Sequence, residues 1–454
     1  MRPIEILICI LLSGSTWIII RANARADHLI RILFLTVLLC LFHLSTEGYR
    51  IQMVPAYGLL GYLFLRIKLK NKISIGTSGK SLLVLWIVIA ILFPLVVSVP
   101  ILPKPSGPFS IGTRVFQWTD STRLEWFTDK NPNDLRKLVA QVWYPAIDDG
   151  EKNAPYMDHM NQRAEMLGNA GGVPGFLIEQ LGLVNTHSLL NAKPVSSSAD
   201  IPLILFSHGI TGQRSLHTIL FEHLASFGYC VVALDHPYDS NLTIFPDGTS
   251  ADYRSNITGN PDSLAIRRKQ LNTRVADIKF IANKMEQMNQ IDGEFYNVLN
   301  MDKVAIVGYS YGGATAIQTT FEDSRFKVCI VLDAWTNPVP YQIIDKGIDK
   351  PFLSLSRPRW DNNPNRSILL DTIISSGNLD QYNFVIMGTE HLDYTDTPVL
   401  NPFSDYVLGT GSIDNKRVLD LVNQFVRGFL EKYLIQTDED FYSIHQAFPE
   451  AIIQ

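Results

Sequence analysis

An α/β fold with a mainly parallel central sheet, preceded by an α-helical transmembrane segment, is the architecture that this sequence predicts. The first 104 residues are strongly apolar, whereas from about Ser110 short apolar runs alternate with longer helix-like stretches. Such alternation is typical of parallel sheets with crossover helices. A Gly-x-Ser-x-Gly pattern also lies where one apolar run meets a small-residue helix. We therefore expect a membrane anchor in residues 1–104 and one globular domain in residues 105–454.

Charge divides the chain at the same place. The first 104 residues carry 11 Lys/Arg and 3 Asp/Glu, against 28 and 41 in the remainder. The acidic remainder argues against nucleic acid as a partner, because phosphate binding requires a basic face. No CxxC pair or His/Cys cluster is present, so the sequence predicts neither a metal site nor a cofactor. Unpaired structural thiols are expected at Cys9, Cys40, Cys230 and Cys329.

The membrane segment contains up to four transmembrane helices. The best single span is Leu82–Leu102, which is uncharged and long enough to cross a bilayer. Membrane helices tolerate a proline such as Pro94 within this span. Three runs that are short for a span precede it: Ile6–Ile20, Leu29–Leu44 and Ile51–Leu65.

The basic residues predict how these helices are oriented. They gather in the loops after the first and third runs, at Arg21, Arg25, Arg31, Arg66, Lys68, Lys70, Lys72 and Lys80. The positive-inside rule then predicts a multi-pass cell-membrane protein whose globular domain is extracytoplasmic. Two alternatives stay open. Residues 1–24 could be a cleaved signal peptide, because Ala22-Asn23-Ala24 resembles a cleavage site, and the third run could be interfacial or re-entrant.

The globular domain shows the strands and helices of an α/β sheet. Expected strands are Leu138–Tyr144, Ile201–Phe206, Cys230–Leu234, Val304–Val307, Val328–Leu332, Pro351–Leu355 and Phe384–Met387. Expected helices are Ser215–Phe227, Ala265–Met288, Gly313–Glu322 and about Asn415–Tyr433. The basic residues of the second helix predict a solvated face. Residues 150–195 lack strand periodicity and predict an excursion over the sheet that caps or lines a pocket.

The strongest chemical signal is Gly308-Tyr309-Ser310-Tyr311-Gly312-Gly313. An apolar strand leads into it and a small-residue helix leads out of it. This context is that of a nucleophile elbow, a tight turn that exposes the serine at the N-terminus of a helix. Gly308 and Gly312 flank the serine because larger side chains would collide across so sharp a turn. We therefore predict Ser310 as a nucleophile in an α/β-hydrolase fold.

A serine hydroxyl needs a base and an acid that orients the base, and in this fold both follow the serine. Only His391 and His445 lie beyond Ser310, and His391 is the one in a loop at the end of a strand. Asp333 ends the strand that follows the elbow helix, so its carboxylate should emerge beside Ser310. Its rivals, Asp361 and Asp380, both fall within loops.

An oxyanion hole requires two backbone N–H donors. One is expected from Tyr311, directly after the nucleophile. The other is expected from Ile210, in the loop Ser207-His208-Gly209-Ile210 that follows the strand IPLILF. Gly209 lets this loop turn tightly. His208 precedes the nucleophile in the sequence and is predicted to shape the loop rather than to act as a base.

The combination of FSHGITG, ALDHPYDS, VGYSYGGATAIQ, CIVLDAW and MGTEH resembles the platelet-activating factor acetylhydrolase family, of the plasma lipoprotein-associated phospholipase type. The segment VAQVWYPA resembles the early strand of that family, and the likeness covers about residues 110–430. It implies Ser310, Asp333 and His391 as the triad and the amides of Ile210 and Tyr311 as the oxyanion hole. The membrane segment and residues 150–195 depart from the family pattern.

The sequence thus predicts a membrane-anchored, calcium-independent serine hydrolase of carboxylic esters. The resemblance implies a small ester or phospholipid-like substrate with a short acyl chain, and a role in lipid degradation beside a bilayer. Two further hypotheses use the same residues. A peptidase or an acyltransferase would employ the same triad, whereas a non-catalytic sensor would keep only the fold.

Overall fold

A computed structural model describes residues 1–21, 26–68, 75–128, 131, 133–195, 200–257, 259–291, 293–358, 365–437 and 441–454. The chain forms two compact units. The helical unit comprises residues 1–101, 160–184 and 400–403, and the sheet unit comprises residues 102–159, 185–399 and 404–454. The boundary between residues 101 and 102 lies close to the predicted one at residue 104. The division of the chain there into two domains stays a prediction.

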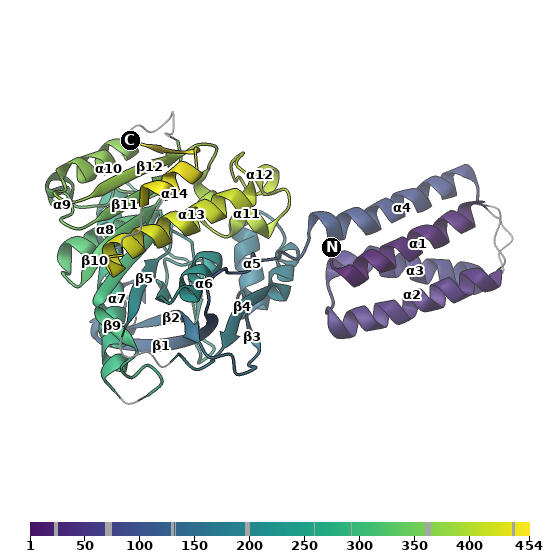
Figure 1. The fold of residues 1–454 in the computed structure, drawn as a ribbon. Coiled ribbons are helices and arrows are strands. Elements are labelled where there is room, and N and C mark those ends of the chain that lie inside the picture. Colours follow the sequence, from purple (N-terminus) through teal and green to yellow (C-terminus); the bar gives the residue numbers. More distant parts are fainter. Residues whose placement is uncertain are drawn as a thin grey trace. The chain divides into compact units, whose positions relative to one another are not determined.

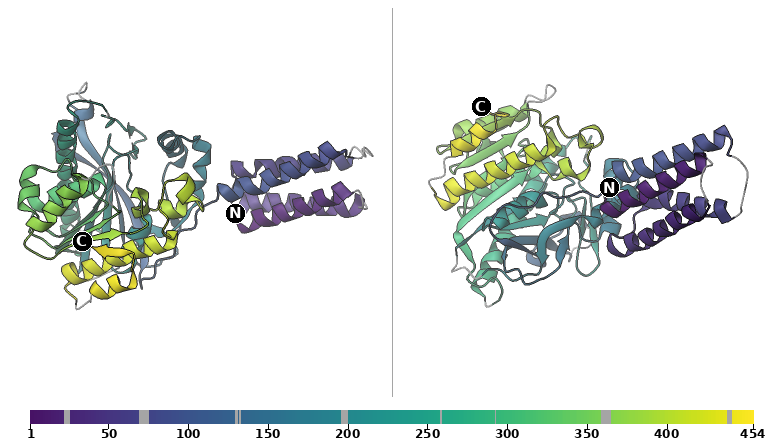
Figure 2. Two further views of the ribbon diagram at one scale, coloured as in Figure 1. Left: turned by 90° about the horizontal axis from the view of Figure 1, so that it is seen from above. Right: turned by 45° about the vertical axis from the view of Figure 1, so that its right-hand side comes forward.

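The helical unit begins with four apolar helices that run alongside one another (Figures 1 and 2). They are α1 (Pro3–Arg21), α2 (Ala26–Thr46), α3 (Val54–Lys68) and α4 (Thr77–Val96). Among the described residues, three helices are long and apolar enough to cross a membrane, namely Pro3–Arg21, His28–Thr46 and Thr77–Val96. Side chains such as Ile8, Leu33 and Leu59 are fully buried between these helices. The unit also contains α5 (Met160–Gly171).

The fourth helix differs from the predicted span of Leu82–Leu102. It begins at Thr77 and ends at Val96, so residues 97–102 lie beyond its end. Pro100 explains this end, because a proline ring in a helix collides with the carbonyl four residues earlier, here that of Val96. Pro94 is tolerated inside the helix, as expected.

The sheet unit is built on eleven strands in the order β13-β12-β11-β10-β9-β5-β6-β2-β1-β4-β3. The strands from β12 to β6 in this order are parallel to one another, whereas β2 pairs antiparallel with β6 and with β1. Their bounds are β1 (Ser110–Leu124), β2 (Leu135–Ala146), β3 (Asn153–Pro155), β4 (Asn185–Leu190), β5 (Ile201–Ser207), β6 (Cys230–Asp235), β9 (Leu299–Tyr309), β10 (Phe326–Leu332), β11 (Phe352–Ser356), β12 (Gln381–Ile386) and β13 (Ala451–Ile453). A separate hairpin is formed by β7 (Leu242–Ile244) and β8 (Ser250–Asp252).

Helices cover both faces of this sheet. One face is covered by α7 (Ser263–Gln290), α8 (Tyr311–Glu322), α9 (Tyr341–Lys346) and α10 (Asn365–Ser376). The other is covered by α6 (Thr218–Ser226), α13 (Asn415–Leu430) and α14 (Phe441–Ala447). The short helices α11 (Thr397–Leu400) and α12 (Ser404–Val407) precede α13. In Figure 1, α13 and α14 cross in front of the sheet. The predicted α/β-hydrolase architecture is confirmed.

Two expectations from the sequence were wrong in part. Residues 150–195 include the strands β3 and β4, which extend the edge of the sheet beyond β1. Both are too short to show a period-two pattern. On α7, Arg274 is 1% exposed rather than solvated, and Arg267 is also buried. Arg274 lies one turn from Leu271 and Ile278, so it shares the face of the helix that packs on the sheet.

Candidate active site

Ser310 occupies a sharp turn between β9 and α8. Its φ of 55° and ψ of −117° lie in a region that non-glycine residues rarely adopt. A Cβ added at Gly308 would lie 2.1 Å from the carbonyl oxygen of Gly312, and one at Gly312 would lie 1.9 Å from that of Ser207. Both positions therefore require glycine, and the turn has the geometry of a nucleophile elbow.

Ser310, His391 and Asp333 lie within hydrogen-bonding distance of one another in that order. The Oγ of Ser310 lies 3.0 Å from Nε2 of His391, and Nδ1 of His391 donates to the Oδ2 of Asp333. Because the hydrogen bond to the carboxylate keeps the imidazole proton on Nδ1, Nε2 is unprotonated and can accept the serine proton. The three residues predicted as a triad thus meet in the arrangement that acyl transfer requires.

Asp333 directly follows β10, the strand next to β9. Its backbone N–H donates to Leu355 O at 2.7 Å, and its φ of 42° turns the chain sharply at the edge of the sheet. The Nε of Arg357 lies 3.2 Å from Oδ2 of Asp333, which supplies a compensating positive charge. Of its rivals, Asp380 accepts from the hydroxyl of Tyr433, and Asp361 lies outside the described residues.

His391 lies in the loop after β12, where Tyr309 supports its ring. The two rings stack with their centroids 4.8 Å apart, and the Tyr309 hydroxyl donates to the backbone carbonyl of His391 at 2.9 Å. The His391 side chain is 29% exposed, so a substrate can reach it. The alternative base, His445, instead contacts the carbonyl of Ala451 near the end of the chain.

The predicted oxyanion donors belong to the residue after Ser310 and to the loop after β5. Among the described residues, no acceptor takes the backbone N–H of Ile210 or that of Tyr311. A Cβ added at Gly209 would lie 3.1 Å from the Cβ of Ser310, so the loop after β5 approaches the serine closely. Two unused amides beside a nucleophile are what an oxyanion hole requires. Their catalytic role stays a prediction.

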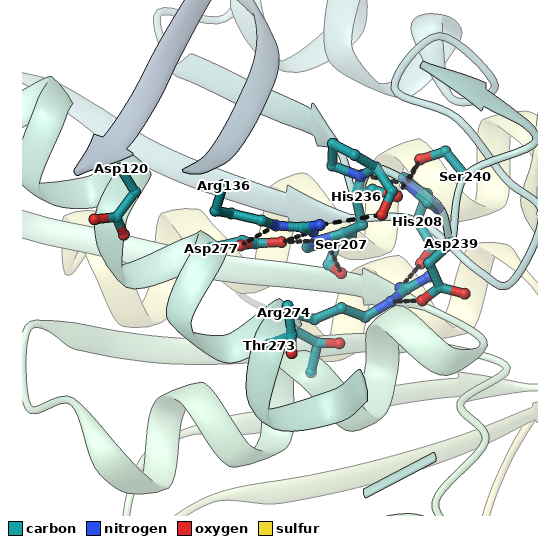
Figure 3. A network of polar contacts seen from close by, with 12 residues as sticks. Asp120, Arg136, Ser207, His208, His236, Asp239, Ser240, Thr273, Arg274 and Asp277 are labelled. Carbon is teal, nitrogen blue, oxygen red and sulfur yellow. Dashed lines mark hydrogen bonds and ion pairs between the residues drawn. The ribbon is translucent and has the colours of Figure 1, made fainter. Parts of the chain in front are cut away.

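The sequence did not reveal a second Ser–His–Asp constellation behind this loop (Figure 3). The Ser207 hydroxyl lies 3.0 Å from Nε2 of His236, and Nδ1 of His236 lies 2.9 Å from Asp277. Burial alone would raise the pKa of Asp277, but Arg136 and the hydrogen bond from His236 hold this pKa well below its usual range. A signal was present in the motif ALDHPYDS, whose histidine directly follows a buried strand.

One group in the helical unit has the donor atoms of a metal site. Ligand atoms of Glu5, His43 and Glu47 all lie within 4.8 Å of one another. Arg2 lies 3.0 Å from Glu5, and Arg50 lies 3.5 Å from the same carboxylate. The arginines thus already compensate the negative charge that a cation would neutralise.

The fold and the position of these residues define the class of protein. A ferulic acid esterase from Streptomyces cinnamoneus superposes with a TM-score of 0.63, at 23% sequence identity over 79% of this chain and all of that chain. The chain therefore has the α/β-hydrolase fold.

Sequence comparison identifies the family. Residues 98–448 match the family model described as platelet-activating factor acetylhydrolase, isoform II. A platelet-activating factor acetylhydrolase of Cavia porcellus is 28% identical over 73% of this chain and 78% of its own length. The platelet-activating factor acetylhydrolase of Canis lupus familiaris is 25% identical over 73% of this chain and 77% of its own length. The chain belongs to the platelet-activating factor acetylhydrolase family and is a carboxylic ester hydrolase.

Proposed function

We propose that Ser310, His391 and Asp333 hydrolyse short-chain acyl esters through a covalent acyl-enzyme. The 3.0 Å contact between Ser310 Oγ and His391 Nε2, at a nucleophile elbow, is the observation that carries the proposal. The serine oxygen attacks the acyl carbonyl carbon while its proton passes to Nε2 of His391. The resulting imidazolium returns the proton to the leaving alcohol, and Asp333 stabilises its positive charge. A water molecule then attacks the acyl-enzyme while His391 accepts its proton. His391 returns this proton to the Ser310 oxygen, and the carboxylic acid is released.

The amides of Ile210 and Tyr311 are the proposed donors to the oxyanion of each tetrahedral intermediate. The support for this role is that both N–H groups lack an acceptor within the described part of the chain. Donors that are held in place before the reaction need no reorganisation when the charge develops, and removing one typically slows turnover about 10²- to 10³-fold.

A phospholipid-like ester with a short acyl chain is the proposed substrate class. Membership of the platelet-activating factor acetylhydrolase family supports it. We further propose that the apolar helices anchor the enzyme in a bilayer. Large apolar side chains on them, among them Phe34, Leu41 and Leu82, are more than half exposed, as lipid-facing residues would be.

Hydrolysis of p-nitrophenyl esters of increasing chain length by the full chain in detergent tests this proposal. We expect turnover of the acetate and butyrate that falls steeply with longer chains and that is lost in Ser310→Ala. A fluorophosphonate label should react with the wild-type protein alone. Turnover that persists in Ser310→Ala would reject the assigned nucleophile, whereas equal rates on long chains would reject the short-chain preference.

A further inference from the structure

We infer that Arg274, together with His208, positions both sides of the oxyanion hole. The inference rests on the proposed function, because it concerns how the amides of Ile210 and Tyr311 are aimed. Neither Arg274 nor His208 is placed to touch the substrate through its side chain, since both are at most 1% exposed. They act through the backbone and the ring that carry the donors.

The key contact is the carbonyl oxygen of Gly209. It accepts from Nδ1 of His208 at 2.6 Å, from the amide of Gly212 at 3.1 Å and from Nη2 of Arg274 at 3.3 Å. This carbonyl belongs to the same peptide unit as the N–H of Ile210. The peptide unit is planar and trans, so its C=O and N–H point in opposite directions. Three donors on the oxygen therefore fix the direction of the Ile210 N–H.

Arg274 also holds the preceding peptide. Its Nη1 donates to the carbonyl of His208 at 2.6 Å, so one guanidinium spans two successive carbonyls. The Nε of Arg274 donates to Asp239, which compensates the buried positive charge (Figure 3). The planar guanidinium presents donors in a fixed fork, which a lysine ammonium cannot reproduce. The orientation of the loop thus depends on an arginine specifically.

The second donor, Tyr311, touches the same guanidinium. The Arg274 carbon Cζ lies 4.5 Å from the centroid of the Tyr311 ring, within the range of a cation–π interaction. The Tyr311 ring is buried and its hydroxyl donates to the carbonyl of Arg267, also on α7. Arg274 therefore contacts the peptide unit that contains the Ile210 N–H, through the Gly209 carbonyl, and also the side chain of Tyr311, and so it connects both proposed donors to α7.

The hydrogen bonds of His208 define its protonation state. Nδ1 donates to the Gly209 carbonyl, and Nε2 accepts from the amide of His236 at 3.2 Å, so Nε2 carries no proton. The Ser240 hydroxyl lies 2.8 Å from the same nitrogen. Burial and the nearby Arg274 lower the pKa of His208 well below its ordinary value. His208 is therefore a neutral, fixed donor to the Gly209 carbonyl.

The substitution Arg274→Lys tests the inference, with Arg136→Lys as its matched control. Arg136 is also buried and belongs to the same polar network, but it donates to Asp277, Glu125 and the carbonyl of Pro237. We expect kcat for p-nitrophenyl acetate to fall about 10- to 100-fold in Arg274→Lys, less than for loss of a donor. KM should change by less than about 3-fold, because the ground-state ester gains little from the hole. Arg136→Lys should keep kcat within about 3-fold of the wild type.

Binding of a trifluoromethyl ketone separates positioning from a general structural role. This inhibitor forms a tetrahedral adduct whose oxyanion occupies the hole. Its inhibition constant should rise in Arg274→Lys by about the same factor as kcat/KM falls, and should stay unchanged in Arg136→Lys. If both variants lose the same activity, or if inhibitor affinity does not follow kcat/KM, Arg274 has only a structural role.

A pair of substitutions at His208 tests the same carbonyl contact independently, should Arg274→Lys fail to fold. The amide nitrogen of His208→Asn can replace Nδ1, whereas that of His208→Gln replaces Nε2. We expect His208→Asn to keep at least about 10-fold more activity than His208→Gln, because only the first retains a donor to Gly209. The opposite order would overturn the inference. Activity that persists in Ser310→Ala would instead overturn the proposed function and leave these differences to be explained otherwise.

Discussion

The sheet unit holds two Ser–His–Asp constellations that differ in their surroundings rather than in their contacts. In Ser310–His391–Asp333 and in Ser207–His236–Asp277, the distance from serine oxygen to imidazole nitrogen is the same 3.0 Å. The His391 side chain is 29% exposed, however, whereas Ser207, His236 and Asp277 are all fully buried. Hydrogen-bond geometry alone therefore does not define a catalytic site.

The backbone around each serine gives the physical reason. Ser310 sits in a strained turn at a helix N-terminus, and the described part of the chain provides no acceptor for the amides of Ile210 and Tyr311. Ser207 is the last residue of the regular strand β5, where it lies between Leu234 of β6 and Gly308 of β9. The first constellation thus offers a place for a developing negative charge, whereas the second does not. We interpret the buried one as a structural network inside the sheet unit.

Removal of each serine hydroxyl should give the largest difference in activity between the two constellations. Ser310→Ala should lower kcat on the order of 10⁴- to 10⁶-fold, as expected for loss of a nucleophile. Ser207→Ala should lower it by no more than about 10-fold and should destabilise the fold by about 1–2 kcal/mol, because Nε2 of His236 loses its donor. Rates on p-nitrophenyl acetate and fluorophosphonate labelling measure the activity, and urea unfolding measures the stability. Loss of labelling in folded Ser207→Ala would contradict this assignment.

Replacement of each carboxylate should mainly lower the activity in the accessible constellation and mainly lower the stability in the buried one. Asp333→Asn should reduce kcat about 10⁴-fold with little change in stability, because the amide no longer selects the required tautomer of His391. Asp277→Asn should instead cost about 3–5 kcal/mol of unfolding free energy, because it removes the buried carboxylate that pairs with both Arg136 and Arg123. Steady-state kinetics and urea midpoints distinguish the two. If Asp277→Asn inactivates without destabilising, the buried constellation has a more direct role.

The accessible constellation was predictable from the sequence because local rules place each of its members. The elbow motif places Ser310, and the order of elements then leaves only one strand-end aspartate and one loop histidine at the same sheet edge. The geometry agrees with that prediction, although the catalytic roles stay to be tested. The buried constellation was missed because Asp277 comes from the middle of α7, and nothing in a helical pattern shows which carboxylate faces a neighbouring strand.

The fold was predicted well in the buried parallel strands and poorly toward the β3 edge of the sheet, where the 15-residue strand β1 was also missed. The buried strands of the parallel sheet form apolar runs, so β5, β6 and β10 were located within a residue or two. β3 and β4 escaped notice because three to six residues at a sheet edge give no clear periodicity. The burial of Arg274 was missed for a different reason: a charged residue is expected outside unless its partners, here Asp239 and two carbonyls, are known.

The smallest expected effect concerns acid stability, which the buried histidine should control. Burial and the nearby Arg274 lower the pKa of His236 to about 4, against about 6.5 in an unfolded chain. Between these values only the unfolded state takes up the proton, so the stability contribution of neutral His236 is present above pH 6.5 and is lost as the pH falls toward 4. Asp277, whose pKa is held well below its usual range, titrates below this window.

The substitution His236→Asn should isolate this contribution, because its amide can still donate to Asp277 but does not titrate. Between pH 7 and pH 5 we expect the wild-type protein to lose about 2 kcal/mol more unfolding free energy than the variant does. Other buried histidines with lowered pKa values, such as His217 and His223, act equally in both proteins and cancel in this difference. Urea unfolding of the full chain in detergent, followed by fluorescence at both pH values, measures it. Equal losses in the two proteins would mean that His236 is protonated in the folded state, which its two hydrogen bonds argue against.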